Sequence, residues 1–320
     1  MLEQRATSAI DLNSVARLLT SNEKLARGKF QDNDAIPTDA IVKHTFEKLA
    51  TKLATGQVRI HSQNGPNERL SGAVLVENSD WDSRHFGVTI GRLSLIVFDP
   101  ETDLALRRAL LLRVLASESF RMLSVRVNLA DMATVQALEQ EGGMLTDILL
   151  TFHFNSSWTL PAFFNDGVRI TEALPTDHEI LVRKAQKLFK IDRFHSDPNL
   201  AGAKSDQLYS KWVFNSLNGL ADVTFVARKK DEPVGFITCK VERIARDFNY
   251  GIIDLVGVDP AEGGRGVGAS LVRSALEWFA PKVSSVYVGT QAANNRAVKL
   301  YERIGFRHAC SEATLHVWRS

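Results

Sequence analysis

A glycine-rich segment constrains the fold of this chain more than any other part of its sequence. Residues 252–258 form an apolar, β-branched run closed by Asp259-Pro260, which predicts a buried strand. Apolar side chains recur at helical spacing from Leu271 to Leu276, which predicts a helix. Between the two lie four glycines within six positions, Gly263, Gly264, Gly266 and Gly268. We therefore expect a strand, a glycine loop and a helix in succession.

Such a loop has two explanations. Glycine takes positive φ and lets the main chain approach a ligand closely, and the first turn of a helix leaves N–H groups unpaired. Because the helix dipole also favours negative charge there, an anion is one predicted occupant. A plain tight turn would need the same glycines. The loop lacks the Lys-Ser/Thr of a nucleotide-triphosphate loop, and no acidic residue follows a second strand as in dinucleotide-binding proteins.

A second motif favours the anion site. Residues 286–291 are predicted to form a strand, and residues 294–306 read Asn-Asn-Arg-Ala-Val-Lys-Leu-Tyr-Glu-Arg-Ile-Gly-Phe. Together the two motifs resemble those of the GNAT N-acyltransferase superfamily, Gln/Arg-x-x-Gly-x-Gly/Ala and Asn-x-x-Ala-x-x-Leu-Tyr…Gly-Phe. The chain departs from this pattern at Gly263, where the family usually has Gln or Arg, so a side-chain contact to phosphate is missing. Arg265 is a candidate for supplying the positive charge.

The resemblance implies an acetyltransferase that uses acetyl-CoA as co-substrate and no metal. It implies that the main chain of the central strand pairs with the pantetheine arm, and that one N–H there serves as oxyanion donor. Gly257 suits a β-bulge that frees such a donor. The implied coenzyme contacts are Leu255, Val256, Gly257, Val258, Gly263, Gly264, Arg265, Gly266, Val267, Gly268, Ala269, Asn294 and Ala297.

Tyr301 is the general acid that the resemblance implies for the leaving thiolate. It lies seven residues after Asn294, two helical turns, so both are expected on one helix face. A free Tyr has a pKa of about 10 and a thiol about 8.5, so full proton transfer would be uphill by roughly 2 kcal/mol. We therefore expect protonation to be concerted with cleavage of the thioester, or to need a lowered Tyr pKa. A core tyrosine is the alternative.

The two halves of the chain resemble each other. Residues 97–100 match 257–260 at an offset of 160, and helix and strand residues beyond them follow the same offset with one residue of slippage. The first copy has residues 101–106 where the second has its glycine loop, and Glu139 where the second has Tyr301. Carboxylates at that helix start would repel a pyrophosphate. We therefore expect one coenzyme site per chain, in the second half.

The predicted fold is α/β, an α+β mixed sheet, with a degenerate first GNAT-like half and a coenzyme-binding second half. The predicted parts are a helical N-terminal extension at 1–60, the degenerate domain at 61–160 and the acyltransferase domain at 167–320, with a connection near 155–167. The chain has 320 residues, 44% of them hydrophobic and 24% charged, as in globular proteins. Its net charge of +2 gives no nucleic-acid footprint.

Cellular location follows from what the sequence lacks. Two cysteines, Cys239 and Cys310, provide no disulfide framework, and no apolar run approaches the roughly 18 residues of a membrane span. No secretory signal precedes the first helix. A cytoplasmic protein without a membrane span is predicted.

The acceptor is predicted from resemblance alone. From about residue 72 onward, motifs such as Trp-Asp-Ser at 81–83 and Arg-Phe-His-Ser-Asp-Pro at 193–198 resemble the dTDP-fucosamine N-acetyltransferases. That family implies a small-molecule acceptor, the amine of a nucleotide-linked amino-deoxyhexose, and a possible homodimer. The candidate substrate residues are Trp81, Arg193, His195, Asp254 and Gln291.

Each of these candidates also has a purely structural explanation. Trp81 could plug a core, Arg193 could be a surface charge, His195 could belong to a capped turn, and Asp254 could be paired with a lysine or arginine. Asp254 or Glu242 could also act as base through water. At the level of function, the alternatives are another amine acceptor, such as an aminoglycoside, a polyamine or a protein N-terminus, and a non-catalytic acyl-CoA-binding protein.

Overall fold

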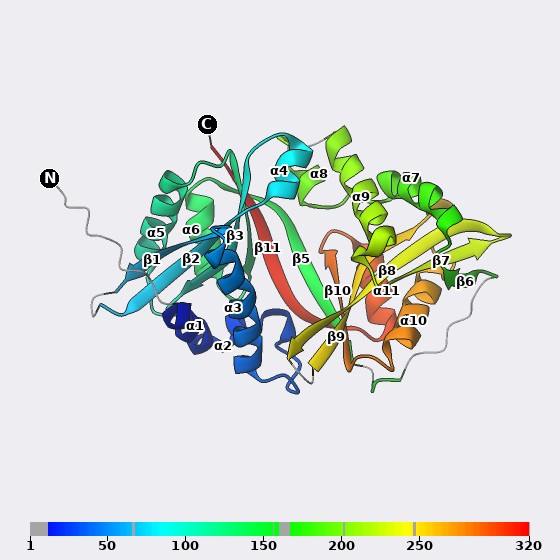
Figure 1. Ribbon diagram of the computed structural model, residues 1–320, viewed down its shortest axis with the longest axis horizontal. Helices are drawn as coiled ribbons and strands as arrows, with labels where there is room; N and C mark the ends of the chain where they lie inside the picture. The colour runs from blue at the N-terminus through cyan, green and yellow to red at the C-terminus, as the bar shows by residue number, and fades with distance from the viewer. Residues whose placement is uncertain are drawn as a thin grey trace. The chain divides into compact units, whose positions relative to one another are not determined.

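The computed structural model describes residues 12–65, 68–155, 157–159, 167–200, 202–245 and 248–319 (Figure 1). The chain forms two compact units. The first contains Met1–Leu145 and Glu312–Ser320, and the second contains Thr146–Ser311. Each unit is built on a mixed β-sheet, in agreement with the predicted fold class. No helix of the described ranges is long and apolar enough to cross a membrane.

Among the described residues of the first unit, five strands form the sheet. Their order is β1, β2, β3, β4 and the final part of β11, and β3 and β4 are the parallel pair. The strands are β1 (Val58–Asn64), β2 (Leu70–Asn78), β3 (Ile90–Phe98), β4 (Met122–Asn128) and β11 (Arg307–Trp318). The helices are α1 (Leu12–Ser21), α2 (Glu23–Arg27), α3 (Thr38–Ala54), α4 (Asp80–Phe86), α5 (Leu104–Ser117) and α6 (Met132–Gln140), with a short turn at Gly28–Phe30.

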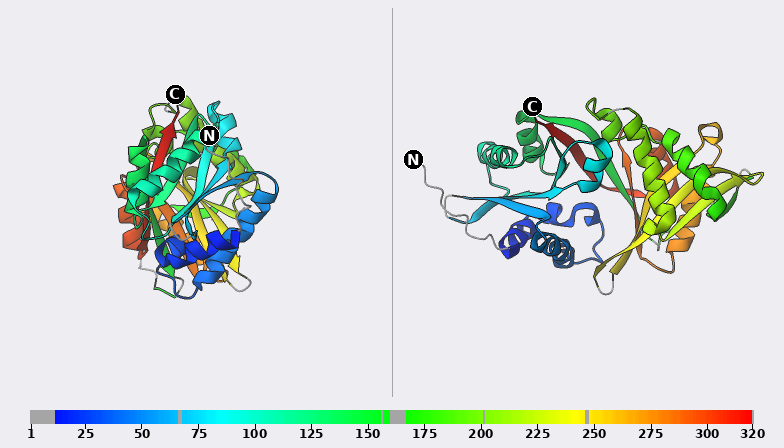
Figure 2. Two further views of the ribbon diagram at one scale, coloured as in Figure 1. Left: turned by 90° about the vertical axis from the view of Figure 1, so that its left-hand side faces the viewer. Right: turned by 45° about the horizontal axis from the view of Figure 1, so that its top comes forward.

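Alternating side chains of β2 serve both faces of this sheet. Leu75 packs in one core with residues of α1 and α3, and Val76 packs in another with residues of α5 and α6. The right-hand view of Figure 2 shows these two helix groups on opposite sides of the strands. The helices between residues 12 and 54, expected to be an addition to the domain, thus supply one complete layer of the first unit.

In the described part of the second unit, six strands follow the order β6, β7, β8, β9, β10, β5, with β9 and β10 as the parallel pair. The strands are β5 (Gly143–Asn155), β6 (Arg169–Glu172), β7 (Val223–Lys229), β8 (Glu232–Ala245), β9 (Phe248–Val258) and β10 (Ser285–Gln291). The helices are α7 (His178–Leu188), α8 (Arg193–Ser196), α9 (Ala203–Asn215), α10 (Val267–Phe279) and α11 (Asn295–Ile304), with short turns at Pro175–Asp177, Ser216–Leu220 and Pro260–Glu262. Figure 1 shows α10 and α11 on one side of the sheet.

The two halves of the sequence exchange their last strands. β5 follows the first half in sequence, yet it pairs with β10 of the second unit. The end of β11 closes the second half in sequence, yet it pairs with β4 of the first unit. These compact units therefore differ from the predicted division at 61–160 and 167–320. Of the predicted connection at 155–167, residues 156 and 160–166 lie outside the described part of the chain.

Equivalent irregularities confirm that the halves repeat one fold. The β2–β3 register skips Ser94, and the β8–β9 register skips Asp254, again at an offset of 160. Gly91 and Gly251 are also equivalent, because a Cβ on either would lie 2.4 Å from Phe120 or 2.7 Å from Phe279. Each half thus has a bulge in its central strand and a glycine under an aromatic ring.

The bulge at Asp254 changes the face to which β9 directs its side chains. Gly251 lies under Phe279 of α10, and Val258, seven residues later, also packs on the α10 side. An unbroken strand would send residues an odd number apart to opposite faces. The bulge was expected at Gly257, and this was wrong: Gly257 pairs in register with Phe236. It is glycine because a Cβ would lie 2.8 Å from the Phe236 ring and 2.9 Å from Leu188.

A threonine side chain completes the bulge. The N–H of Leu255 donates to the Oγ1 of Thr238 at 3.0 Å, and Thr238 is fully buried. The substitution Thr238→Val keeps the shape and removes this acceptor, so the buried N–H loses its partner. We expect the free energy of unfolding to fall by about 1–3 kcal/mol, measured by urea denaturation.

Thr224→Val is the matched control. Thr224 is opposite Thr238 in the β7–β8 pair and is buried, and its hydroxyl takes no part in the hydrogen bonds found between described residues. An equal loss in both variants would show that the hydroxyl of Thr238 has no special role at the bulge.

Candidate functional site

The predicted glycine loop lies where β9 gives way to α10. Gly264 and Gly266 have positive φ angles of 79° and 83°, which only glycine adopts at little cost. Gly266 is the N-cap of α10, and no side chain caps the helix there. The first-turn amides of Val267, Gly268 and Ala269 therefore remain available to an external acceptor. A Cβ at Gly264 would meet nothing within 4 Å, so the loop is open on that side.

The other two glycines of the loop are needed for packing against α11. A Cβ at Gly268 would lie 3.2 Å from the side chain of Leu300, and one at Gly263 would lie 3.1 Å from the Nη1 of Arg296. Arg296 and Leu300 are four residues apart on α11 and so lie on one helix face. The motif thus combines two glycines for conformation with two for close approach.

The charges beside the loop are mainly positive. Lys229 donates to both carboxylate oxygens of Glu262 at 2.9 Å, and this hydrogen bond holds the pKa of Glu262 below its ordinary value. Arg265 lies 3.7 Å from the same carboxylate and is largely exposed. Arg296 adds a second guanidinium next to Gly263. Arg296 was not among the predicted coenzyme contacts, although it lies in the Asn-Asn-Arg-Ala motif. Loop, helix end and charges fit a diphosphate group.

The equivalent helix start in the first unit is closed by its own carboxylate. Asp103 is the N-cap of α5, and its Oδ1 accepts from the N–H of Leu106 at 2.8 Å. A first-turn donor is therefore occupied, and a negative charge lies where an anion would bind. This supports the prediction of one coenzyme site per chain.

The β9 segment from Leu255 to Val258 has a free edge. β9 and β10 pair in parallel through Gly251–Ile253 and Val286–Val288. Beyond these pairs β9 continues to Val258 and β10 to Gln291. Among the described strands, none pairs with β9 from Leu255 onward on the side that faces β10. Its backbone groups there can pair with an extended ligand, as predicted for the pantetheine arm.

Tyr301 is buried on α11. Its ring lies 6.0 Å from Phe152 and 5.7 Å from Phe306 between centroids, and burial raises the pKa of its hydroxyl. No hydrogen bond to this hydroxyl occurs within the described ranges. Asn294 is the N-cap of α11, and its Oδ1 accepts from the N–H of Ala297 at 3.2 Å. The Asn294 carbonyl oxygen is thus engaged in capping, and its amide NH₂ is the group left for a ligand.

Asp254 is fixed by two donors at the bulge. Its Oδ2 accepts from the Nε1 of Trp212 at 2.9 Å and lies 2.8 Å from the Nζ of Lys240. The structural alternative for Asp254, an ion pair with a lysine, is therefore present. Trp212 belongs to α9, so the contact ties this helix to the central strand. A role for Asp254 toward a substrate stays a prediction.

His195 has both ring nitrogens engaged. Nδ1 lies 2.5 Å from Asp192 and Nε2 lies 2.9 Å from Asp206. Asp192 also caps α8 by accepting from the N–H of His195, so the capped-turn alternative describes this residue. Its neighbour Arg193 stacks its guanidinium 4.3 Å from the Phe194 ring centroid.

The two remaining predicted substrate residues belong to different units. Gln291 is the last residue of β10 and is opposite Leu149 of β5. Trp81 belongs to α4 of the first unit, where it stacks on His85 with ring centroids 5.3 Å apart. The second unit therefore brings together the loop, the β9 edge and α11, and Trp81 is not part of that group.

Asp147 on β5 was not anticipated. Both of its carboxylate oxygens are shielded from water, and neither has a hydrogen-bond partner among the described residues. Leu150, Phe152 and Phe154 of β5 pack on the side of α10 and α11, so Asp147 points to the opposite face. A single acidic residue on a strand carries no sequence signal that would distinguish it from a paired one.

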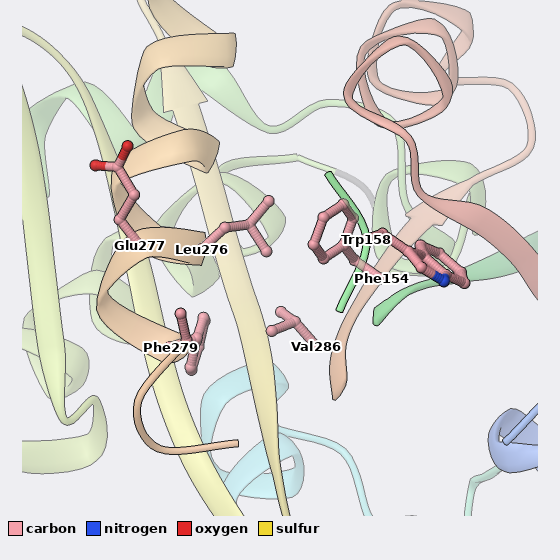
Figure 3. A pocket seen from close by; sticks show the side chains of 7 residues that line it. Phe154, Trp158, Leu276, Glu277, Phe279 and Val286 are labelled. Carbon is pink, nitrogen blue, oxygen red and sulfur yellow. The ribbon is translucent and has the colours of Figure 1, made fainter. Parts of the chain in front are cut away.

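A small apolar hollow lies at the far end of α10 from the loop (Figure 3). It encloses about 100 Å³. Its lining residues are Phe154, Trp158, Leu276, Glu277, Phe279, Ala280 and Val286. Figure 3 shows the Glu277 carboxylate turned away from it, so the hollow offers no polar group for chemistry.

Comparison with known proteins agrees with this geometry. Residues 188–306 match the acetyltransferase (GNAT) family, so the predicted resemblance is confirmed for the second half. The spore coat polysaccharide biosynthesis protein SpsD of Bacillus subtilis is 28% identical over 258 residues, which cover 79% of this chain and 86% of that protein. The dTDP-fucosamine acetyltransferase of Escherichia coli O6:H1 is 29% identical over 136 residues, 42% of this chain and 56% of that one.

The repeat also has a structural relative. A tandem GNAT protein from the clavulanic acid biosynthesis pathway superposes with a TM-score of 0.50 at 12% identity, and the match covers 82% of this chain and 83% of the other. This likeness concerns the fold alone. It agrees with two GNAT-like halves in one chain.

Proposed function

We propose that this protein, whose second half carries a GNAT acetyltransferase domain, acetylates the amine of a nucleotide-activated amino-deoxy sugar. Acetyl-CoA is the acetyl donor of this domain family. One arrangement supports the proposal most: an uncapped helix start at Gly266, a free β9 edge and a buried phenol belong to one unit. The sugar acceptor is supported by the names of the relatives, which refer to spore coat polysaccharide biosynthesis and to dTDP-fucosamine acetylation.

The proposed roles follow from the geometry. The first-turn amides of α10 and the nearby guanidinium groups hold the diphosphate, and the β9 edge pairs with the pantetheine arm. Bound acetyl-CoA supplies the thioester that the acceptor amine attacks. As the C–S bond breaks, Tyr301 donates a proton to the departing sulfur, and the proton that the amine nitrogen loses on forming the amide restores the Tyr301 hydroxyl through water. Because burial raises the pKa of Tyr301, complete transfer to a thiolate is less favourable than for a free phenol, so protonation accompanies bond cleavage.

Asp147, on the sheet face opposite α10 and α11, is a carboxylate suited to a cationic amine. A buried carboxylate without a partner is costly, and Asp177 and Asp131 of the same chain are instead paired with Arg228 and Arg107. The Asp147 carboxylate has no such partner among the described residues. We infer that this carboxylate attracts the acceptor as its ammonium form, which loses one proton to water before the neutral amine attacks. A homodimer and a cytoplasmic location stay predictions.

The acceptor class can be tested directly. The protein is incubated with acetyl-CoA and one amine at a time: dTDP-4-amino-4,6-dideoxygalactose, an aminoglycoside, spermidine, or a peptide with a free N-terminus. We expect thiol release and an acetylated product by mass spectrometry with the nucleotide sugar. Turnover of another amine only would support a GNAT enzyme with a different acceptor.

Removal of the Tyr301 hydroxyl tests the proton donor. We expect Tyr301→Phe to lower kcat by about a hundredfold, with a smaller change in KM for acetyl-CoA, because a general acid acts in the transition state. Tyr250→Phe removes another buried phenol, which donates to Glu242, and should affect stability more than kcat. Unchanged kcat in Tyr301→Phe, with coenzyme still bound, would mean that another group protonates the leaving thiolate.

The pH profile gives an independent check on Tyr301. The acid must be protonated to act, and its raised pKa keeps it protonated beyond the ordinary tyrosine value of about 10. We therefore expect kcat of the wild type to show no loss from this group up to at least about pH 9. A decline in kcat below that pH that disappears in Tyr301→Phe would contradict this assignment.

Asp147→Asn tests the acceptor carboxylate. The variant keeps the shape and removes the unpaired charge, so the melting temperature should stay equal or rise. We expect KM for the nucleotide amino sugar to increase by about tenfold, as for loss of one charged hydrogen bond. A fall in melting temperature with unchanged KM would mean that the carboxylate serves the fold instead.

A further inference from the structure

The position that the family pattern gives to a Gln or Arg is occupied here by a glycine with a guanidinium beside it. The Nη1 of Arg296 lies 3.1 Å from the point where a Cβ of Gly263 would be. A side chain at position 263 would therefore start in the space that the Arg296 side chain already borders. The missing side chain and the extra cation belong to the same place in the loop.

The contact is held in register by the packing of α11. Leu300, one helical turn after Arg296, touches the point where a Cβ of Gly268 would be, at 3.2 Å. The two side chains of one helix face thus lie along the two ends of the glycine loop. Tyr301 and Ile304 anchor α11 in the core, so the backbone from which the Arg296 side chain extends stays beside the loop.

The electrostatic setting of Arg296 is unfavourable without an anion. Arg296 is in the first turn of α11, where the helix dipole disfavours a cation. The uncapped start of α10 adds a second positive helix end at the same loop. The nearby carboxylate of Glu262 is already neutralised by Lys229. An anion of more than one charge at the loop would remove this repulsion.

We propose that Arg296 supplies from α11 the phosphate contact that the loop lost at position 263, and that it binds the diphosphate of the coenzyme. This inference rests on the proposed function. Arg265, which the sequence favoured for this role, is the weaker candidate, because its guanidinium lies 3.7 Å from the Glu262 carboxylate, which already offsets part of its charge. Both arginines are exposed, so exposure does not separate them.

The test compares three single variants by their dissociation constants. Arg296→Met removes the proposed contact, Arg265→Met removes the rival cation, and Arg303→Met removes an exposed arginine from the last turn of the same helix. Binding of coenzyme A, 3′-dephospho-coenzyme A and pantetheine is measured by calorimetry, so no acceptor is needed. Melting temperatures are measured in parallel.

We expect Arg296→Met to raise the dissociation constants of coenzyme A and dephospho-coenzyme A by about tenfold, since a charge-assisted phosphate contact is lost. The dissociation constant of pantetheine should stay unchanged. Arg303→Met should change none of the three. The melting temperature of Arg296→Met should not fall, because the substitution removes a cation from a helix start.

Any one of three results would overturn this inference and leave the proposed function standing. They are equal affinities of Arg296→Met and Arg303→Met, a larger loss in Arg265→Met than in Arg296→Met, and a loss confined to coenzyme A, which would place Arg296 at the 3′-phosphate. Wild-type protein that binds no coenzyme A would overturn the proposed function as well.

Discussion

The bulge at Asp254 is the constraint on which the second unit depends. One extra residue in β9 lets Gly251 and Val258 face the same helix, although they are an odd number of residues apart. The N–H of Leu255 then turns to the Thr238 hydroxyl, and the Asp254 carboxylate meets Trp212 of α9. The same irregularity therefore sets the direction of the strand that leads into the glycine loop and attaches the helix on its other face.

Local patterns in the sequence predicted the parts of the site that are local in the fold. The strand, the glycine loop and α10 follow one another, so their order and spacing identify them. The sequence could not separate the roles of the four glycines, because Gly263 and Gly268 are small for the sake of α11, a helix that returns only after β10. For the same reason the sequence did not show that Arg296, within the recognised Asn-Asn-Arg-Ala motif, lies next to Gly263.

The features that could not be predicted from the sequence depend on contacts between residues far apart in the chain. The repeat at an offset of 160 was visible, and the bulges at Ser94 and Asp254 confirm it in the structure. Nothing in β5 or β11 indicates which half it completes, since an alternating strand fits either sheet edge. The bulge was placed wrongly at Gly257 because a glycine in a strand signals either a bulge or a close approach, and only the Phe236 ring and Leu188 decide between them.

The divergence of the two halves follows from one helix start. α5 and α10 occupy equivalent places, but Asp103 caps α5 with a carboxylate while Gly266 leaves α10 without a side-chain cap. A side-chain cap stabilises a helix by about 1 kcal/mol, so the open start of α10 sacrifices stability that α5 retains. Buried Arg107 strengthens the closed arrangement further by donating to the Thr102 carbonyl and to Asp131. The first half thus gains stability at the place where the second half keeps donors free for an anion.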